Sequence, residues 1–172
     1  MVAPGGAAAG QPGPAAVDPG ASASHPGPAV ARLARAIADA IIAQALAEYP
    51  TECCGIIAGS ADPGASGVAR RYEPCRNESA SPYRYTIHPD DAYRVVVAID
   101  DADEAVWGIV HSHVRSPAVP SLTDLGLAQF PDALYLLVSL APGEADPVTG
   151  EPSLRAWRIV GREVFEVRLE VV

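Results

Sequence analysis

The sequence predicts an α/β fold, in the form of an α+β mixed sheet flanked by helices. Apolar residues recur every four positions at Ile37, Ile41 and Ala45, which is the spacing of one buried helix face. Compact apolar runs have the length of buried strands, and they cover residues 53–58, 105–111 and 133–140. Near the end of the chain, apolar and charged residues alternate over 164–171, which is typical of a strand with one wet face.

The first half of the predicted fold contains one long helix and several short strands. Its elements are a strand at 30–33, a helix over 34–49, a strand over 53–58, a loop over 62–67, and strands over 68–74 and 83–87. Pro50 ends the helix because proline cannot continue the helical hydrogen bonding. The strand over 68–74 is rather polar, which favours a position at the sheet edge.

The second half begins with a helix from Pro89 to about Asp103. Proline fits the first helical turn, and Asp90 and Asp91 suit the positive N-terminal end. The later elements are a strand over 105–111, a loop over 115–120, a helix over 121–130, a strand over 133–140, a loop over 142–152, and a hairpin of strands 154–160 and 164–171 around Gly161.

Two regions differ in composition. Residues 1–28 hold 8 Ala, 6 Gly and 6 Pro and a single charged side chain, Asp18. Such a segment buries too little apolar surface to offset its ordering entropy, so we expect a disordered tail. Residues 29–172 are long enough for one sizeable core and are expected to form one domain.

Charge and cysteine content restrict the function and the compartment. The chain has 12 basic and 21 acidic residues, for a net charge of −9, which argues against nucleic acid or an anionic membrane as a partner. All the basic residues are arginine, so lysine-based catalysis is excluded. Three cysteines do not make a disulfide framework, and no signal segment or membrane span is visible, so a cytoplasmic location is expected.

The segment with most chemical information is His111-Ser112-His113, followed after seven residues by Ser121-Leu122-Thr123-Asp124. Two histidines at positions i and i+2 of an extended chain point to the same side and can reach one ion. Asp124 lies in the first turn of the next helix and can turn its carboxylate toward them. Two histidines and one carboxylate leave a fourth tetrahedral position open, as in catalytic zinc sites that activate water.

Other readings of the same residues stay open at this point. Histidines at a strand end also occur as ordinary polar residues. Ser121 followed three positions later by Asp124 resembles a capping box at a helix N-terminus, with no functional role. For Glu52 alone, the plainer reading is a solvated residue after a helix stop.

The combined pattern resembles the JAMM (MPN-plus) metalloproteases. His111-Ser112-His113, the seven-residue gap and Ser121-x-x-Asp124 match the family motif at every motif position. Glu52-Cys53-Cys54-Gly55, placed before a buried run, is similar to the family's upstream glutamate element. The resemblance covers about residues 30–172, and it implies an MPN/JAB1-like fold with a cytidine-deaminase-like sheet flanked by helices.

The resemblance also implies a role for each motif residue. His111, His113 and Asp124 would be the ligands of Zn²⁺. Glu52 would be the general base that takes a proton from water and later delivers it to the leaving amine. Ser121 would donate a hydrogen bond to the tetrahedral oxyanion, provided that its hydroxyl faces the metal.

Neighbouring polar residues have simpler interpretations. Cys53 and Cys54 lie beside Glu52, and a thiolate is a good zinc ligand, but consecutive strand residues face opposite ways and buried cysteine is commonly a small hydrophobe. Cys75 is expected to be structural. His88 precedes Pro89 and is expected to cap its helix, and Arg115 is interpreted as a solvated loop residue rather than a carboxylate ligand.

The compact chain looks more like the small bacterial Mec-plus hydrolases than the ubiquitin-binding members with insertions. That resemblance implies a ubiquitin-like sulfur carrier ending in Gly-Gly as substrate and partner, cleaved at the amide after its tail to release cysteine and the carrier. An extended tail suits addition along a sheet edge. The alternatives are a catalytically silent MPN scaffold that binds a partner and a hydrolase of another small amide. The sequence does not indicate the oligomeric state.

Overall fold

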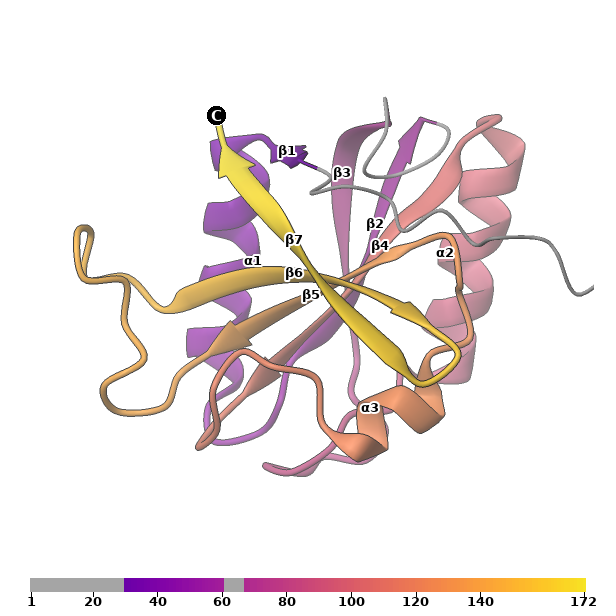
Figure 1. Ribbon diagram of the computed structural model, residues 1–172. Helices are drawn as coiled ribbons and strands as arrows, with labels where there is room; N and C mark the ends of the chain where they lie inside the picture. Colours follow the sequence, from indigo (N-terminus) through magenta and orange to yellow (C-terminus); the bar gives the residue numbers. More distant parts are fainter. Residues whose placement is uncertain (1–29, 61–66) are drawn as a thin grey trace, which may run out of the picture.

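The computed structural model describes residues 30–60 and 67–172, and their centre is one seven-stranded mixed sheet (Figure 1). The strand order is β1-β7-β6-β5-β4-β2-β3. The strands are β1 (Val30–Leu33), β2 (Cys54–Ser60), β3 (Val68–Cys75), β4 (Ala105–His113), β5 (Leu134–Ser139), β6 (Ser153–Val160) and β7 (Glu163–Val171). The helices are α1 (Arg35–Glu48), α2 (Pro89–Asp101) and α3 (Leu122–Leu127). The predicted mixed sheet flanked by helices is confirmed.

The two long helices cover opposite faces of the sheet, and Figure 1 shows α1 and α2 on its two sides. The face under α1 has a core in which Ile37, Ile41 and Ala45 pack against Trp107 and its neighbours on the central strands. The predicted helical spacing is therefore confirmed as the buried face of α1. Strand β1 contacts β3, so the two edges of the sheet approach each other and the sheet is curled.

The face under α2 holds a second core and also the histidines. Val95 and Ile99 of α2 pack with Ile109 of β4 in this cluster. Side chains alternate between faces along a strand, so His111 and His113 project from the same face as Ile109. In the register of β2 with β4, Cys54 lies opposite His111. The site is thus built on a central strand that is paired on both sides, with β2 and β5.

The segment 83–87 was predicted to be a strand, and that prediction is wrong. Only one bridge forms there, between Asn77 and Ile87. The side chain of Asn77 accepts a hydrogen bond from the Thr86 N–H (3.0 Å) and donates one to the Arg84 carbonyl (3.2 Å). These contacts occupy the Arg84 carbonyl and the Thr86 N–H, while the Thr86 carbonyl accepts from the Glu78 N–H at 2.8 Å.

The third helix is shorter than predicted. The helix expected over 121–130 ends at Leu127, and Ala128 already leaves the helical backbone at φ −72° and ψ 87°. Pro131 disfavours helical backbone at Phe130 before it. Phe130 instead exchanges hydrogen bonds with the Tyr135 hydroxyl, at 3.0 and 3.2 Å.

Some of the other expectations concern residues that the structure does not describe, and others are confirmed. The tail at 1–28 and nearly all of the loop at 62–67 lie outside the described residues. The polar strand β3 is at the sheet edge, as predicted, and Gly161 turns the β6–β7 hairpin at φ +62°. Among the described residues, no helix combines the length and the hydropathy that a membrane crossing needs.

Candidate metal centre

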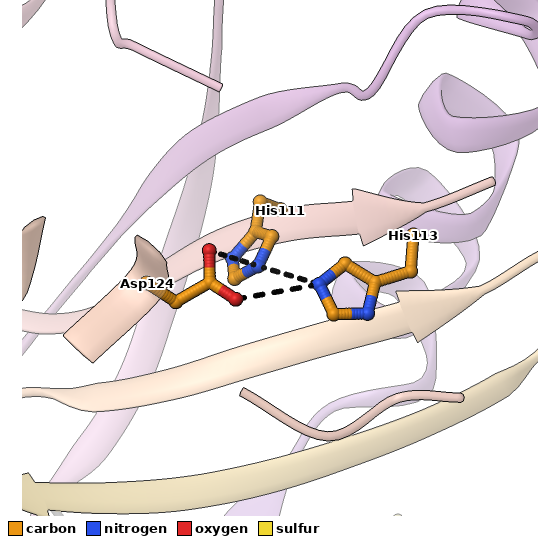
Figure 2. A group of neighbouring side chains, drawn as sticks. All are labelled: His111, His113 and Asp124. Carbon is orange, nitrogen blue, oxygen red and sulfur yellow. Dashed lines mark hydrogen bonds and ion pairs between the residues drawn. The ribbon is translucent and has the colours of Figure 1, made fainter. Parts of the chain in front are cut away.

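Three side chains converge above the carboxyl end of β4 (Figure 2). The Nε2 atoms of His111 and His113 are 3.3 Å apart. Asp124 places Oδ1 at 3.3 Å from Nε2 of His111 and Oδ2 at 3.4 Å from Nε2 of His113. All three residues are buried, and their ligand atoms form a group that could hold a metal ion.

Local structure brings Asp124 to the histidines. Ser121 is the N-cap of α3, and the two residues form a capping box. The Ser121 N–H donates to Oδ2 of Asp124 at 2.6 Å, and the Asp124 N–H donates to Oγ of Ser121 at 3.3 Å. The capping interpretation is therefore confirmed, and it serves the cluster, because the cap fixes the Asp124 carboxylate against the histidines.

The separations suit a tetrahedral zinc ion. Zinc–nitrogen bonds of about 2.0–2.1 Å at tetrahedral angles place neighbouring ligand atoms about 3.3 Å apart. The 3.3 Å between the two Nε2 atoms matches that edge length, and each imidazole lies 3.3 or 3.4 Å from a different oxygen of the Asp124 carboxylate. The donor set of two imidazoles and one carboxylate is also typical of a catalytic zinc site. The residues present therefore fit Zn²⁺.

Metal binding needs an ionised carboxylate and bare imidazole nitrogens, and the groups of the cluster meet these needs to different degrees. Burial opposes ionisation of Asp124, but hydrogen bonds from His111 and His113 hold its pKa well below the usual range. Nδ1 of His113 lies 2.7 Å from the Pro117 carbonyl, which can only accept, so this nitrogen carries the proton. Burial opposes the charged imidazolium, but the hydrogen bond from Nε2 to Asp124 raises the pKa of His113, so a metal ion would bind at Nε2 by displacing a proton.

The ring of His111 is held by packing. It is fully buried, and burial lowers its pKa. The Tyr85 ring stacks on it, with centroids 4.3 Å apart and an interplanar angle of 19°. Nδ1 of His111 is buried without a hydrogen-bond partner among the described residues. Tyr85 is therefore a site residue that the sequence analysis missed, and its position in an apparent strand carried no signal of that contact.

Glu52 lies close to the cluster and is 4% exposed. Burial raises its pKa to about 7, and the charges of His113 and Asp124 act on it in opposite directions. Its backbone is held on both sides: its N–H donates to the Ser81 carbonyl at 3.0 Å, and its carbonyl accepts from Nδ2 of Asn77 at 2.9 Å. A carboxyl group with a pKa near neutrality can both take up and release a proton.

Cys53, which follows Glu52, is hydrogen-bonded to the strand that carries the metal-binding histidines. The Cys53 N–H donates to Oγ of Ser112 at 2.8 Å, and the Ser112 N–H donates to the Cys53 carbonyl at 3.1 Å. Ser112 lies between the two histidines in sequence, so the same strand segment carries the ligands and fixes the chain beside Glu52. This contact was also absent from the sequence analysis.

The remaining candidates are placed as the simpler interpretations predicted. Cys53 packs in the core under α1 and Cys54 in the core under α2, so they face opposite ways. The Cys54 thiol lies 3.6 Å from the Cys75 carbonyl and is not part of the metal-binding group. His88 is the N-cap of α2 and accepts the Asp90 N–H at 3.3 Å, while Arg115 is exposed.

The loop between β4 and α3 is held by a tryptophan that the sequence analysis did not single out. Nε1 of Trp157 on β6 donates to the Ala118 carbonyl at 2.9 Å, and both residues are buried. Ala118 follows Pro117, whose carbonyl orients His113. Trp157 therefore fixes the loop that holds one imidazole in its metal-binding orientation.

Trp157→Phe is expected to weaken Zn²⁺ binding by about 10-fold, the lower end of the effect of losing a partner of a metal ligand, because Trp157 acts through the Pro117 carbonyl. Competition with a chromophoric chelator measures the change. Trp107→Phe is the matched control, since Trp107 is also fully buried but its indole N–H has no partner among the described residues. Equal zinc affinities for the two variants would contradict this role of Trp157.

Comparison with known proteins agrees with this geometry. Residues 34–160 match the Prok-JAB family model, described as prokaryotic homologs of the JAB domain. A CysO-cysteine peptidase of Mycobacterium tuberculosis is 39% identical over 136 residues, which cover 79% of this chain and 87% of that protein. A desampylase of Haloferax volcanii is 34% identical over 96 residues, covering 55% of this chain and 67% of the relative.

Solved structures with a similar fold include protein DSY2949 of Desulfitobacterium hafniense, at a TM-score of 0.69 and 27% identity over 83% of this chain and 92% of the other. AF2198, a JAB1/MPN domain protein of Archaeoglobus fulgidus, matches at a TM-score of 0.50 and 22% identity, covering 82% and 98% of the two chains. This second likeness is evidence for the fold alone.

Proposed function

Since this chain belongs to the prokaryotic JAB-domain family, we propose that it is a zinc-dependent peptidase that hydrolyses the amide after the C-terminal Gly-Gly of a ubiquitin-like sulfur carrier. The observation that carries the proposal is the cluster of His111, His113 and Asp124, with a buried glutamate beside it. The names of the relatives, a CysO-cysteine peptidase and a desampylase, support a hydrolase acting on small ubiquitin-like proteins.

In the proposed mechanism, the imidazoles of His111 and His113 and the carboxylate of Asp124 would hold the metal. Bound zinc would polarise the scissile carbonyl and acidify water. The Pro117 carbonyl and the Tyr85 ring keep the two imidazoles in orientation. The Ser121 cap keeps the carboxylate in place.

Glu52 is proposed to transfer the proton from the water to the leaving amine. Its carboxylate takes a proton from the attacking water and then delivers it to the nitrogen of the leaving amine. The raised pKa of Glu52, about 7, suits both directions of transfer near neutral pH. The Ser121 Oγ accepts the Asp124 N–H, which leaves its own O–H free to donate to the oxyanion.

The proposed substrate is an extended tail whose last two residues are glycine, and the released amine is cysteine. The strand that carries the histidines is already paired with β2 and β5, so the tail cannot add to it as a strand. It lies instead across the face of the sheet above β4.

The direct test incubates the purified protein with a carrier–cysteine adduct and follows the released carrier by mass spectrometry. We expect cleavage after Gly-Gly that a chelator abolishes and added Zn²⁺ restores. One zinc per chain with no turnover of any Gly-Gly adduct would contradict the peptidase and favour a silent scaffold that binds a partner.

Asn77 is expected to position the general base without touching the metal. Its Nδ2 holds the Glu52 carbonyl, and its Oδ1 accepts from the Ser79 and Thr86 N–H groups. Asn77→Ala removes these contacts and is expected to lower kcat about 10-fold, since a few net hydrogen bonds are worth about 1–2 kcal/mol. Zinc content and KM stay within about 2-fold, because the ligand groups are unchanged.

Ser79→Ala is the matched control for this loop. Among the described residues, its hydroxyl contacts the Thr86 hydroxyl, at 2.9 Å, and has no hydrogen bond to Glu52. It should retain the wild-type kcat. If Asn77→Ala keeps the wild-type kcat or loses its zinc, Asn77 does not act through Glu52.

A further inference from the structure

A small apolar cavity lies next to the metal-binding cluster. Its volume is about 240 Å³. Ile56, Ile109 and Tyr135 on three neighbouring strands form its floor, since they belong to the core under α2. Ligand pockets for small molecules are commonly about 300–1,000 Å³, so this cavity suits a single side chain better than a whole ligand.

The walls of the cavity come from two elements that meet beside the site, α2 and the segment after α3 (Figure 1). Ala92 and Val96 of α2 form one wall, and Leu127 at the end of α3 and Phe130 after it form the other. Val96 is 38% exposed, Leu127 39% and Phe130 36%, so the apolar rim is open to solvent. An exposed apolar rim around a hollow indicates a binding site for an apolar group.

Tyr85 lies between the cavity and the cluster. The Tyr85 ring lines the cavity and also stacks on His111. Ile109 on the cavity floor precedes His111 by two residues on the same face of β4, a distance of about 7 Å along a strand. The cavity floor therefore lies about two residues of extended chain away from the cluster.

The position of Glu52 determines in which direction the substrate chain runs over the cluster. Cys54 pairs with His111, so Glu52 lies at the level of His113, on the opposite side of His111 from Ile109. The leaving amine must approach Glu52 to receive its proton. The acyl side of the substrate therefore extends the other way, toward Ile109 and the cavity.

We infer that this cavity binds an apolar side chain of the carrier tail, at the third residue back from the scissile bond. This inference rests on the proposed function. In an extended chain the first and third residues point to the same side and are about 7 Å apart, the spacing between His111 and Ile109. Two glycines leave the first and second positions without side chains, so the residue before Gly-Gly supplies the selectivity.

Peptide binding to the Glu52→Gln protein loaded with zinc tests the inference without turnover. The probes are two fluorescein-labelled octapeptides that end in Leu-Gly-Gly-Cys or Asp-Gly-Gly-Cys and are otherwise identical. By fluorescence anisotropy, we expect the leucine peptide to bind at least about 10-fold more tightly, as burial of one leucine side chain allows. Equal affinities, or no binding of either peptide, would overturn the inference.

Two variants on α2 test whether the leucine side chain of the peptide binds in this cavity. Val96→Trp fills the cavity, and it should lower the affinity for the leucine peptide at least about 10-fold and remove the preference over aspartate. Val97→Trp is the matched control, because Val97 is 39% exposed on the same helix and does not line the cavity. Equal losses in the two variants would place the leucine elsewhere.

The same peptides separate this inference from the proposed function. Selective binding of the leucine peptide without cleavage by the wild-type enzyme would contradict the peptidase but keep the cavity assignment. Cleavage of both peptides with equal kcat/KM would support the peptidase and overturn the cavity assignment. The comparison of the affinities of the leucine and aspartate peptides needs no cavity variant, so the test remains valid even if Val96→Trp misfolds.

Discussion

Glu52→Gln is expected to reduce kcat by at least about 1,000-fold and to leave the zinc content at one per chain. General acid–base catalysis contributes about 100- to 10,000-fold to a step, and Glu52 is proposed to serve two steps. Glutamine has the same shape but cannot take up the proton. The measurements are single-turnover cleavage of a carrier–cysteine adduct and zinc analysis of the purified variant.

Glu104→Gln is the control for Glu52→Gln. The Glu104 side chain is also buried, at 6% exposed, but it pairs with Arg70 and Arg71 rather than with the metal cluster. It should keep wild-type turnover. Undiminished activity in Glu52→Gln would show that another group is the base, and loss of zinc would show that Glu52 is a ligand.

His113→Ala is expected to lose both zinc and activity. Removal of a direct ligand should lower zinc affinity by more than about 100-fold, because even contacts behind a ligand are worth about 10–100-fold. It also leaves the buried Asp124 carboxylate with one imidazole partner. Isothermal titration with Zn²⁺ measures the affinity, and thermal unfolding with and without zinc measures the loss of the metal's stabilisation.

His88→Ala separates loss of a ligand from loss of any histidine. His88 caps α2, so its removal should cost about 1 kcal/mol of stability and leave zinc binding unchanged. A His113→Ala protein that still binds zinc at wild-type affinity would contradict the assignment of His113 as a ligand.

The sequence predicted much of the fold because its strongest patterns reflect burial. The stripe of Ile37, Ile41 and Ala45 and the apolar run in β5 are buried as expected. The failures occurred where side chains replace backbone pairing. Asn77 occupies the Arg84 carbonyl and the Thr86 N–H, and the helix after Ser121 ends at Leu127, before Pro131. A pattern of hydrophobic residues contains no signal for either effect.

The metal ligands could be predicted because their spacing along the chain has a direct geometric meaning. Two histidines on one face of a strand must lie close together, and the capping box that served as the plainer alternative also holds Asp124 in place. The supporting contacts could not be predicted. Tyr85, Asn77 and Trp157 reach the site from distant parts of the chain, and only the tertiary structure brings them there.

The assignment of a zinc ion to two imidazoles and one carboxylate is tested most directly by X-ray absorption at the zinc edge. The protein is loaded with one equivalent of Zn²⁺ for this measurement. We expect only nitrogen and oxygen neighbours, at about 2.0–2.2 Å, with the outer-shell scattering of two imidazole rings. A sulfur neighbour at about 2.3 Å would place Cys53 or Cys54 on the metal, and a spectrum with no imidazole scattering would contradict the proposed centre.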